Sequence, residues 1–217
     1  MRLYGFWRST ATWRVRIALG YKGVEFEYVP VHLRRGGGEQ HTPAFRRKNP
    51  MGHVPVLECD DEGHGLRLAE SMAILEYLEE RYPDPPLLPA DRRLRARARQ
   101  LALLVVSAIQ PLQNTRVQLY VKEQLRADED AWTRHWVTSG LTALDALTNE
   151  TAGEFSVGNT LSVADVCLVP QLAFARRFRI DLGPYPTLLR VEEACAPLPA
   201  FVAAHADRQI DAEPALT

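Results

Sequence analysis

The first third of the chain alternates between the hydrophobic periods of strands and of a helix. The run "RLYGF" is short and rich in β-forming residues, whereas "TATWRVRIALGYKG" has helical spacing with Val15, Ala18 and Leu19 on one face. In "VEFEYVPVHL" apolar and charged residues alternate, as in a half-exposed strand. Pro30 within this run predicts the edge of a sheet, because proline lacks the N–H that a central strand needs.

The pattern continues with a hairpin and a second helix. Two apolar runs, "HVPVLEC" and "GLRLA", flank the turn-forming "DDEGH" and predict two paired strands. The segment "SMAILEYLEERY" then predicts a helix that Ser71 opens, with Met72, Leu75 and Leu78 in its buried stripe. Elements in this order are typical of an α/β sandwich around a mixed sheet.

The rest of the chain has a different character. The proline-dense "PDPPLLPADRR" predicts a linker, and nearly every apolar run after it has a helical period. We therefore expect two domains, an α/β domain at residues 1–83 and an all-α domain at residues 90–217.

Composition excludes several classes of protein. With 46% hydrophobic and 24% charged residues the chain can bury a core, and a net charge of −1 argues against nucleic-acid binding. The arginine-rich "DRRLRARARQ" keeps helical spacing and is expected to be a solvated or subunit-facing surface. Three distant cysteines and six scattered histidines predict neither a disulfide framework nor a metal site. No apolar run has the length of a signal or a membrane span, so a cytoplasmic protein is expected.

The first candidate site is the strand-to-helix turn "FWRST". A hydroxyl from Ser9 could donate a hydrogen bond to an anion there, and the helix N-terminus adds positive potential. A thiolate is a suitable guest, because such a field lowers the pKa of a thiol. The alternative is that Ser9, Thr10 or Thr12 only caps the helix.

Two further positions could bind a peptide-like ligand. A cis bond before Pro55 would expose the N–H and C=O of Val54 at the end of the sheet. Glu70 and Ser71, at a helix start, could bind the ammonium and the carboxylate of an amino acid, although a plain helix cap would explain them as well.

The helical part of the chain offers two more signals. In "ARRF", Arg176 and Arg177 belong to an otherwise apolar helix, so one of them could face a cleft; alternatively both extend to the surface. In "LSVADV", Ser162 and Asp165 have the spacing of a structural capping box.

Taken in order, the blocks "RSTATWRVRIAL", "NPMGHVPVL", "ESMAILEYLEERYP", "IQPLQN", "SVADVCLVPQ" and "ARRFRIDLGPYP" resemble the zeta class of glutathione transferases over nearly the whole chain. The resemblance implies a thioredoxin-like N-terminal domain with a four-stranded mixed sheet, an all-helical C-terminal domain, a homodimer, and glutathione in a cleft between the domains. The implied activity is glutathione-dependent cis–trans isomerisation of maleylacetoacetate or maleylpyruvate in the degradation of aromatic compounds. In that reaction a thiolate adds to the double bond, the bond rotates, and elimination releases the trans product.

The resemblance also implies a role for individual residues. Ser9 matches the thiolate-activating serine, Thr10 can keep a second hydroxyl near the sulfur, and Arg8 and Arg177 match arginines that bind the substrate. The matching glutathione-binding positions are Ser9, Gln40, Val54, Pro55, Glu70, Ser71, Gln110 and Asn114. No metal is implied.

Two positions bear on the reaction and on the substrate. Ala11 stands where the family motif has a cysteine, so thiol exchange and reductive dehalogenation are not expected, whereas isomerisation does not need that cysteine. Arg116 matches an arginine of maleylpyruvate isomerases and favours the shorter diacid, although a structural role on the helix surface explains it equally well.

Two other functions stay open at this point. A zeta-type transferase that conjugates electrophilic acids, for example halogenated ones, would not need the pair Arg8 and Arg177. A binding or regulatory protein without turnover would have lost its glutathione contacts, yet Ser9, Val54 and Glu70 are all present.

Overall fold

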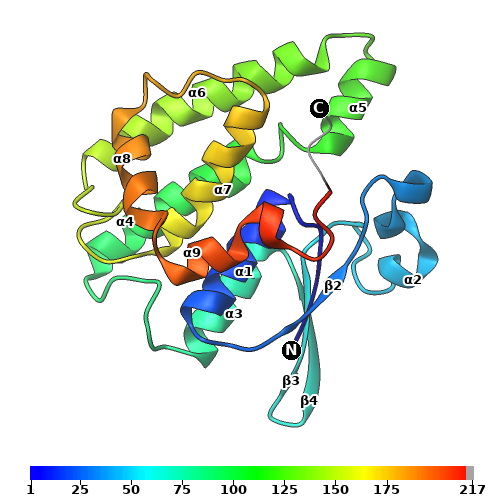
Figure 1. Ribbon diagram of the computed structural model, residues 1–217, viewed down its shortest axis with the longest axis horizontal. Helices are drawn as coiled ribbons and strands as arrows, with labels where there is room; N and C mark the ends of the chain where they lie inside the picture. The colour runs from blue at the N-terminus through cyan, green and yellow to red at the C-terminus, as the bar shows by residue number, and fades with distance from the viewer. Residues whose placement is uncertain (214–217) are drawn as a thin grey trace. The chain divides into compact units, whose positions relative to one another are not determined.

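The computed structural model describes residues 1–213 of the chain. They form two compact units: unit 1 comprises Met1–Pro86 together with the segment from Leu198 on, and unit 2 comprises Leu87–Pro197 (Figure 1). The strands of unit 1 are β1 (Arg2–Gly5), β2 (Glu27–Pro30), β3 (Val56–Asp61) and β4 (His64–Ala69). Its helices are α1 (Thr10–Tyr21), α2 (Pro43–Arg46), α3 (Ser71–Arg81) and α9 (Pro199–Ala204), with short 3₁₀ turns η1 (Arg35–Gly37), η2 (Glu39–His41) and η4 (Ala206–Arg208).

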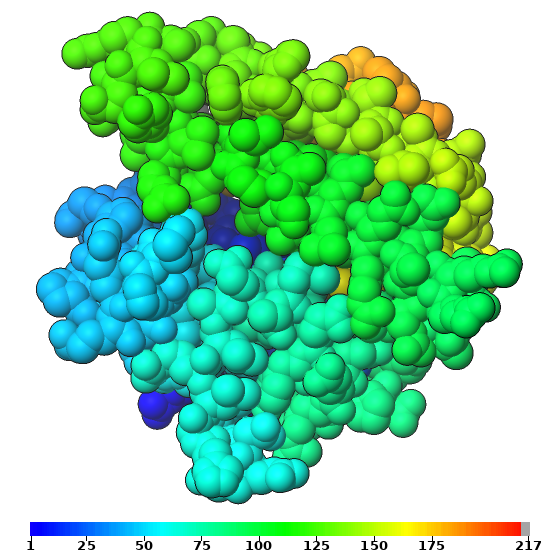
Figure 2. All heavy atoms as spheres, turned by 180° about the vertical axis from the view of Figure 1, so that it is seen from behind, coloured from blue at the N-terminus to red at the C-terminus, as the bar shows by residue number. Residues whose placement is uncertain are grey.

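The four strands form one mixed sheet in the order β2-β1-β3-β4. Strand β2 pairs parallel with β1, whereas β3 is antiparallel to both of its neighbours. The predicted fold class is confirmed, and β2 lies at the edge of the sheet, where Pro30 predicted it. The β3–β4 turn protrudes from the surface in Figure 2.

Helix α1 is the centre of unit 1. It packs against both α3 and α9, and α1 and α3 lie on one side of the sheet in Figure 1, with α2 on the other. All residues from Thr10 to Leu19 are buried, so the one-sided apolar stripe predicted for this helix was too narrow. The close approach of α1 to the sheet depends on Gly5, because a Cβ added there would lie 2.2 Å from Cγ2 of Thr12.

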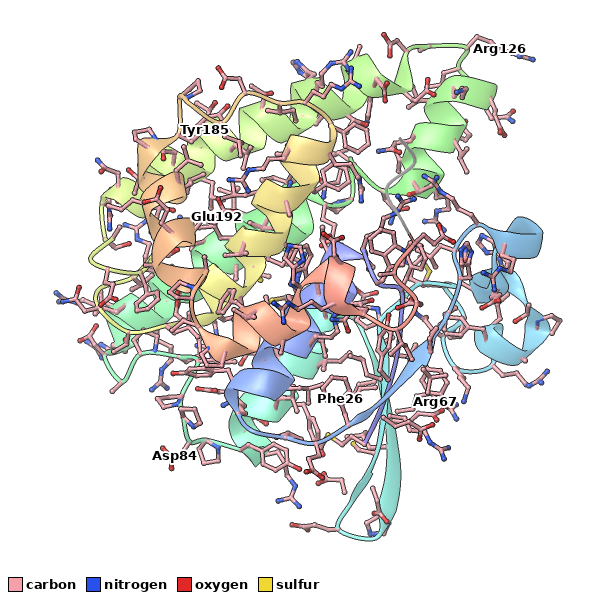
Figure 3. All side chains as sticks on the ribbon, in the orientation of Figure 1. Phe26, Arg67, Asp84, Arg126, Tyr185 and Glu192 are labelled. Carbon is pink, nitrogen blue, oxygen red and sulfur yellow. The ribbon has the colours of Figure 1, made fainter. Side chains whose placement is uncertain are left out.

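The α2 region is attached to the sheet by a polar cluster around Glu58 of β3. The Glu58 carboxylate accepts hydrogen bonds from the Tyr4 hydroxyl at 2.9 Å, from Lys48 Nζ at 2.8 Å and from Arg67 Nε at 2.8 Å. Lys48 follows α2, and Arg67 belongs to β4 (Figure 3). Partial burial opposes ionisation, but these hydrogen bonds lower the pKa of Glu58 to about 2.

Unit 2 is helical. Its elements are α4 (Arg92–Leu103), a π-helical turn η3 (Leu104–Ile109), α5 (Thr115–Glu123), α6 (Glu129–Asn149), α7 (Val163–Arg177) and α8 (Pro186–Cys195). Helix α7 packs against α4 and α8, and most of its residues are buried. The predicted capping box of Ser162 and Asp165 is present at its start. Asp165 also accepts the Ser156 N–H at 2.7 Å, and its complete burial raises its pKa.

The described residues from Leu198 to Glu213 belong to unit 1, whereas the sequence grouped them with the helical domain. The physical reason is the packing of α9 against α1, which lies nearly 180 residues earlier in the chain and carries no local signal of the pairing. Within residues 1–213 no helix has both the length and the apolar character that a membrane span requires.

We predict that Gly5→Ala lowers the unfolding temperature, because the methyl group would displace Thr12 and part α1 from the sheet. Overpacking of this kind costs about 1–3 kcal/mol. Gly65→Ala is the matched control, because it adds the same methyl group to strand β4, where the new Cβ would meet no neighbouring atom within 4 Å. Differential scanning calorimetry should show a lower midpoint for Gly5→Ala alone, and equal shifts in both variants would contradict the proposed clash with Thr12.

The second prediction concerns the contribution of Glu58 to the unfolding free energy at acidic pH. Because the pKa of Glu58 is about 2 in the folded protein and 4.5 ordinarily, the unfolded state binds more protons between these values. The stabilisation is therefore complete above pH 4.5 and is lost as the pH falls through about 2. We expect the difference in unfolding free energy between the parent and Glu58→Gln to shrink steadily over that interval in urea titrations. Glu62→Gln, at the exposed hairpin turn, is the control for the loss of one charge. The difference in unfolding free energy between the parent and Glu62→Gln should not change over the same pH interval.

Candidate active site

The register of the sheet brings three candidate segments to one edge. Val56 of β3 pairs with Tyr4 of β1 and with Ala69 of β4. Because β1 and β4 both run antiparallel to β3, their carboxyl ends lie beside the amino end of β3. Three segments therefore lie together at this end of the strands: the turn Phe6–Ser9, the Val54–Pro55 dipeptide and the pair Glu70–Ser71.

Ser9 stands at the start of α1. Its N–H donates to the Phe6 C=O at 3.0 Å, which closes a tight turn, and its Oγ accepts the Thr12 N–H at 3.3 Å. Ser9 thus caps the helix, as the structural alternative proposed. A hydroxyl that accepts one hydrogen bond still has a proton to donate, so the cap does not prevent Ser9 from binding an anion. Thr10 is buried as the first residue of the helix.

Arg8 lies next to Ser9 in the same turn and is half-buried. Its guanidinium lies 5.7 Å from the ring centre of Phe6 and 5.4 Å from that of Trp7. Burial first, and then the positive charge of Arg34, lowers the pKa of Arg8 from its ordinary value of 12.5. Among residues 1–213 no carboxylate is ion-paired with it. A partly desolvated cation of this kind gains from an anionic ligand.

The Val54–Pro55 bond is cis. The Val54 side chain packs beside Val31, Phe45 and Val56, which attaches this dipeptide to the α2 region. Neither the N–H nor the C=O of Val54 is hydrogen-bonded to any other residue in the described range 1–213. The sequence left the geometry of this bond open, and the cis form leaves the Val54 N–H and C=O without a partner among the described residues.

Glu70 and Ser71 do not form a simple side-chain cap. Glu70 has the left-handed backbone φ of 67°, and its side chain makes no capping bond. Its exposed carboxylate has no partner among the described residues, whereas the buried Ser71 Oγ accepts a hydrogen bond from Arg14 Nη1 at 3.1 Å. A non-glycine residue at positive φ costs of order 1–3 kcal/mol, which the packing around it has to offset.

Arg14 was not among the residues predicted from the sequence. It is completely buried in the middle of α1, and its hydrogen bond to Ser71 connects this helix to the start of α3. The available signal was a charged residue inside an apolar helix, since a buried guanidinium needs hydrogen-bond acceptors.

Gln40 lies on η2, in the loop after β2. Its Nε2 donates to the Leu33 C=O at 3.2 Å, while its Oε1 is buried and has no partner among the described residues. An unpaired buried acceptor is costly unless a ligand or water supplies a donor.

The remaining candidates belong to unit 2. Gln110 and Asn114 lie in the segment between η3 and α5, where Gly140 of α6 packs so closely that an added Cβ would lie 2.3 Å from Cγ1 of Ile109. Asn114 caps α5 by accepting the Arg116 N–H at 2.9 Å, and Arg116 is exposed in the first turn.

A buried amide pair, also missed from the sequence, attaches this segment to α7. Gln113 Nε2 donates to Gln171 Oε1 at 2.9 Å, and Gln171 Nε2 donates back to Gln113 Oε1 at 2.8 Å. Both side chains are almost fully buried. The reciprocal pairing fixes the backbone on which Gln110 and Asn114 stand.

The two arginines at the end of α7 have different surroundings. Arg176 forms an ion pair with Glu192, which lies on α8 (Figure 3). The Arg177 guanidinium lies 4.8 Å from the ring centre of Phe174 and 5.6 Å from that of Phe178, whose rings stack on each other. Arg176 is thus engaged in joining two helices, whereas Arg177 rests on an aromatic platform.

Comparison with known proteins agrees with this arrangement. Residues 3–86 match the N-terminal domain family of glutathione S-transferases. The maleylacetoacetate isomerase of Rattus norvegicus is 45% identical over 209 residues, which are 96% of this chain and 94% of that protein. The maleylacetoacetate isomerase of Anaeromyxobacter dehalogenans 2CP-1, solved with glutathione in its active site, is 50% identical with a TM-score of 0.90 over 98% of this chain and 97% of that one. A bacterial zeta-class maleylpyruvate isomerase is 43% identical with a TM-score of 0.91 and coverages of 98% and 100%.

The chain belongs to the zeta class of glutathione transferases. Three groups of this zeta-class chain have no partner within residues 1–213 and suit the tripeptide glutathione: the Val54 peptide, the Glu70 carboxylate and the buried Gln40 Oε1. The N–H and C=O groups of a peptide ligand can pair with the Val54 peptide. Its ammonium and amide N–H groups can donate hydrogen bonds to the Glu70 carboxylate and to Gln40 Oε1.

We predict that the buried amide pair is energetically coupled. Gln171→Leu leaves the Gln113 amide buried without its partner and should lower the unfolding free energy by about 1–3 kcal/mol. The double variant Gln113→Leu/Gln171→Leu should lose less than the sum of the single variants, because no unpaired amide remains. Gln124→Leu, at the exposed end of α5, controls for the effect of replacing a glutamine by a leucine. Additive losses in urea titrations would exclude the coupling.

Proposed function

We propose that this chain is a glutathione-dependent cis–trans isomerase acting on maleylacetoacetate or maleylpyruvate. The observation that carries the proposal is the single turn Phe6–Ser9. It combines the Ser9 hydroxyl at a helix N-terminus with the half-buried guanidinium of Arg8, which forms no ion pair within residues 1–213 and feels the Glu213 carboxylate only at longer range. A cofactor anion and a substrate anion thus each have a recognition group on adjacent residues. The named activities of the zeta-class relatives support the same reaction.

Glutathione would be held mainly by backbone and short polar groups. The Val54 peptide would pair with the cysteinyl part in the manner of a β-strand, with Pro55 maintaining the bend. Glu70 would accept the γ-glutamyl ammonium, and Ser71 with its N–H at the α3 N-terminus would donate to the carboxylate. Gln40, Gln110 and Asn114 would bind the remaining polar groups.

When bound, glutathione supplies a thiol sulfur that can add to an activated double bond and leave again. Ser9 would donate its hydroxyl proton in a hydrogen bond to that sulfur, and the α1 N-terminus would add positive potential, so that the thiol ionises near neutral pH. Thr10 offers a second hydroxyl beside it. Ala11 is buried and has no thiol, so the site lacks the group that thiol exchange would need.

The substrate carries carboxylates and a ketone conjugated to the cis double bond. Arg8 would balance the negative charge that develops on the ketone oxygen, because its guanidinium is already partly desolvated. Arg177 would bind a carboxylate through two parallel hydrogen bonds, a geometry that lysine cannot reproduce. Arg116 would favour the shorter diacid, maleylpyruvate.

We further infer a homodimeric, cytoplasmic protein. The exposed apolar side chains of Leu94 and Leu103 on α4 and of Met51 are consistent with a protein that covers part of its surface with a second copy.

The decisive measurement is turnover of both substrates, followed by ultraviolet absorbance, with and without glutathione. We predict isomerisation only when glutathione is present. Arg177→Ala should lower kcat/KM by about 10- to 100-fold, the effect of losing one charge-assisted contact. Arg116→Ala should change the ratio between the two substrates more than the rate on the better one.

Arg176→Ala is the matched control, because it removes the neighbouring arginine and its pairing with Glu192 but no proposed substrate contact. Equal losses in Arg176→Ala and Arg177→Ala would refute the role of Arg177. Absence of turnover of both substrates by the parent would refute the proposed function.

A further inference from the structure

The turn that carries Arg8 and Ser9 cannot satisfy its own backbone. Only the Phe6 C=O and the Ser9 N–H bond to each other within it, at 3.0 Å. The N–H and C=O of Trp7 point out of such a turn, and Trp7 is only 8% exposed. Buried peptide groups of this kind need partners from elsewhere in the chain.

The partner of the Trp7 N–H comes from the far end of the sequence. Oδ2 of Asp211 accepts it at 3.0 Å, and the same oxygen accepts the Tyr28 hydroxyl at 3.3 Å. The other carboxylate oxygen, Oδ1, is buried and has no partner among residues 1–213. Asp211 thus connects the turn to Tyr28 of β2 through a single oxygen.

The partner of the Trp7 C=O is Arg16, more than one helical turn into α1. Its Nη2 donates to that carbonyl at 2.7 Å and to the Ala204 C=O at 3.1 Å, and its Nε donates to Ala204 at 3.2 Å. The guanidinium lies 5.6 Å from the centre of the Tyr28 ring. Burial lowers the pKa of Arg16 to about 10, so the group remains a cation at neutral pH.

These contacts form one connected set. Asp211 binds the N–H of Trp7 and Arg16 binds its C=O, so the peptide groups before and after the Trp7 Cα are both held. Tyr28 contacts both Asp211 and Arg16, and Ala204 ends the helix from which the Asp211 segment continues. Arg16 is buried and Asp211 is half-buried, and the negative charge of Asp211 favours the cationic form of Arg16. All of these residues belong to unit 1.

We propose that Asp211 and Arg16 are positioning residues for Arg8 and Ser9, so that the segment after α9 is a working part of the active site. By fixing the two peptide groups on either side of the Trp7 Cα, they set the direction in which the next two side chains leave the turn. The catalytic part of this inference rests on the proposed function, whereas its structural part does not.

The structural part is tested by hydrogen–deuterium exchange of the full chain without glutathione. In Asp211→Ala, amides of the Phe6–Thr12 region should exchange about tenfold faster, as expected from the loss of one charge-assisted bond. Exchange in the β3–β4 hairpin should stay unchanged. Asp207→Ala removes an exposed carboxylate of the same segment and should match the parent. Equal exchange in Asp211→Ala and Asp207→Ala would overturn the inference.

The catalytic part is tested by kinetics of the same variants. We expect kcat of Asp211→Ala to fall about tenfold while KM for glutathione changes little, because Val54, Glu70 and Ser71 are untouched. Asp211→Asn keeps an acceptor oxygen for the Trp7 N–H and should recover most of the loss. A fall in kcat that only follows the folded fraction, or no recovery in Asp211→Asn, would overturn the positioning role.

Arg16→Lys provides an independent variant if Asp211→Ala does not fold. A lysine keeps the charge but cannot bond both carbonyls in the geometry of a guanidinium, so faster exchange confined to the Phe6–Thr12 region supports the inference and parent-like exchange overturns it. If the parent isomerises neither substrate, the proposed function fails, and the exchange measurements still decide whether this segment holds the turn.

Discussion

The antiparallel pairing of β3 with both of its neighbours is the constraint on which the candidate site depends. Because the ladder aligns Val56 with Tyr4 and Ala69, three segments distant in the sequence leave the sheet at one edge. A shift of one residue in this register would turn the side chains of β3 to the opposite face and move the Val54 peptide away from Glu70. The polar cluster around Glu58 links side chains of β1, β3 and β4 to the α2 region and opposes such a shift.

Helix α1 connects this end of the sheet to the groups proposed to react. Its N-terminus carries Ser9, and two buried cations on it bond in different directions: Arg14 to Ser71 at the start of α3, and Arg16 to the Trp7 and Ala204 carbonyls. Buried guanidinium groups tolerate little misplacement, because every lost acceptor exposes a charge to an apolar surrounding. Charges that contribute little to stability as such can therefore define the geometry of a site.

Structural and functional explanations of one residue are not exclusive here. Ser9 caps α1 and still has a proton to donate, so the cap fixes the hydroxyl without consuming it. The two neighbouring arginines of α7 are both exposed but have different contacts. Arg176 joins α7 to α8 through Glu192, whereas Arg177 is supported by two stacked aromatic rings.

The sequence by itself determined the mixed sheet, the hairpin, the edge position of Pro30 and the capping box at Ser162, because hydrophobic period, turn residues and local motifs encode them within a few residues. It also proposed the Ser9, Val54 and Glu70 segments as candidates, with their roles taken from the family resemblance. Only the tertiary structure decided that Arg14 bonds Ser71, that Gln113 pairs with Gln171, and that Asp211 holds Trp7. Each of these contacts joins residues 57 to 204 positions apart. A polar side chain in an apolar run indicates that a partner is needed, but the partner is selected by the packing of helices and strands.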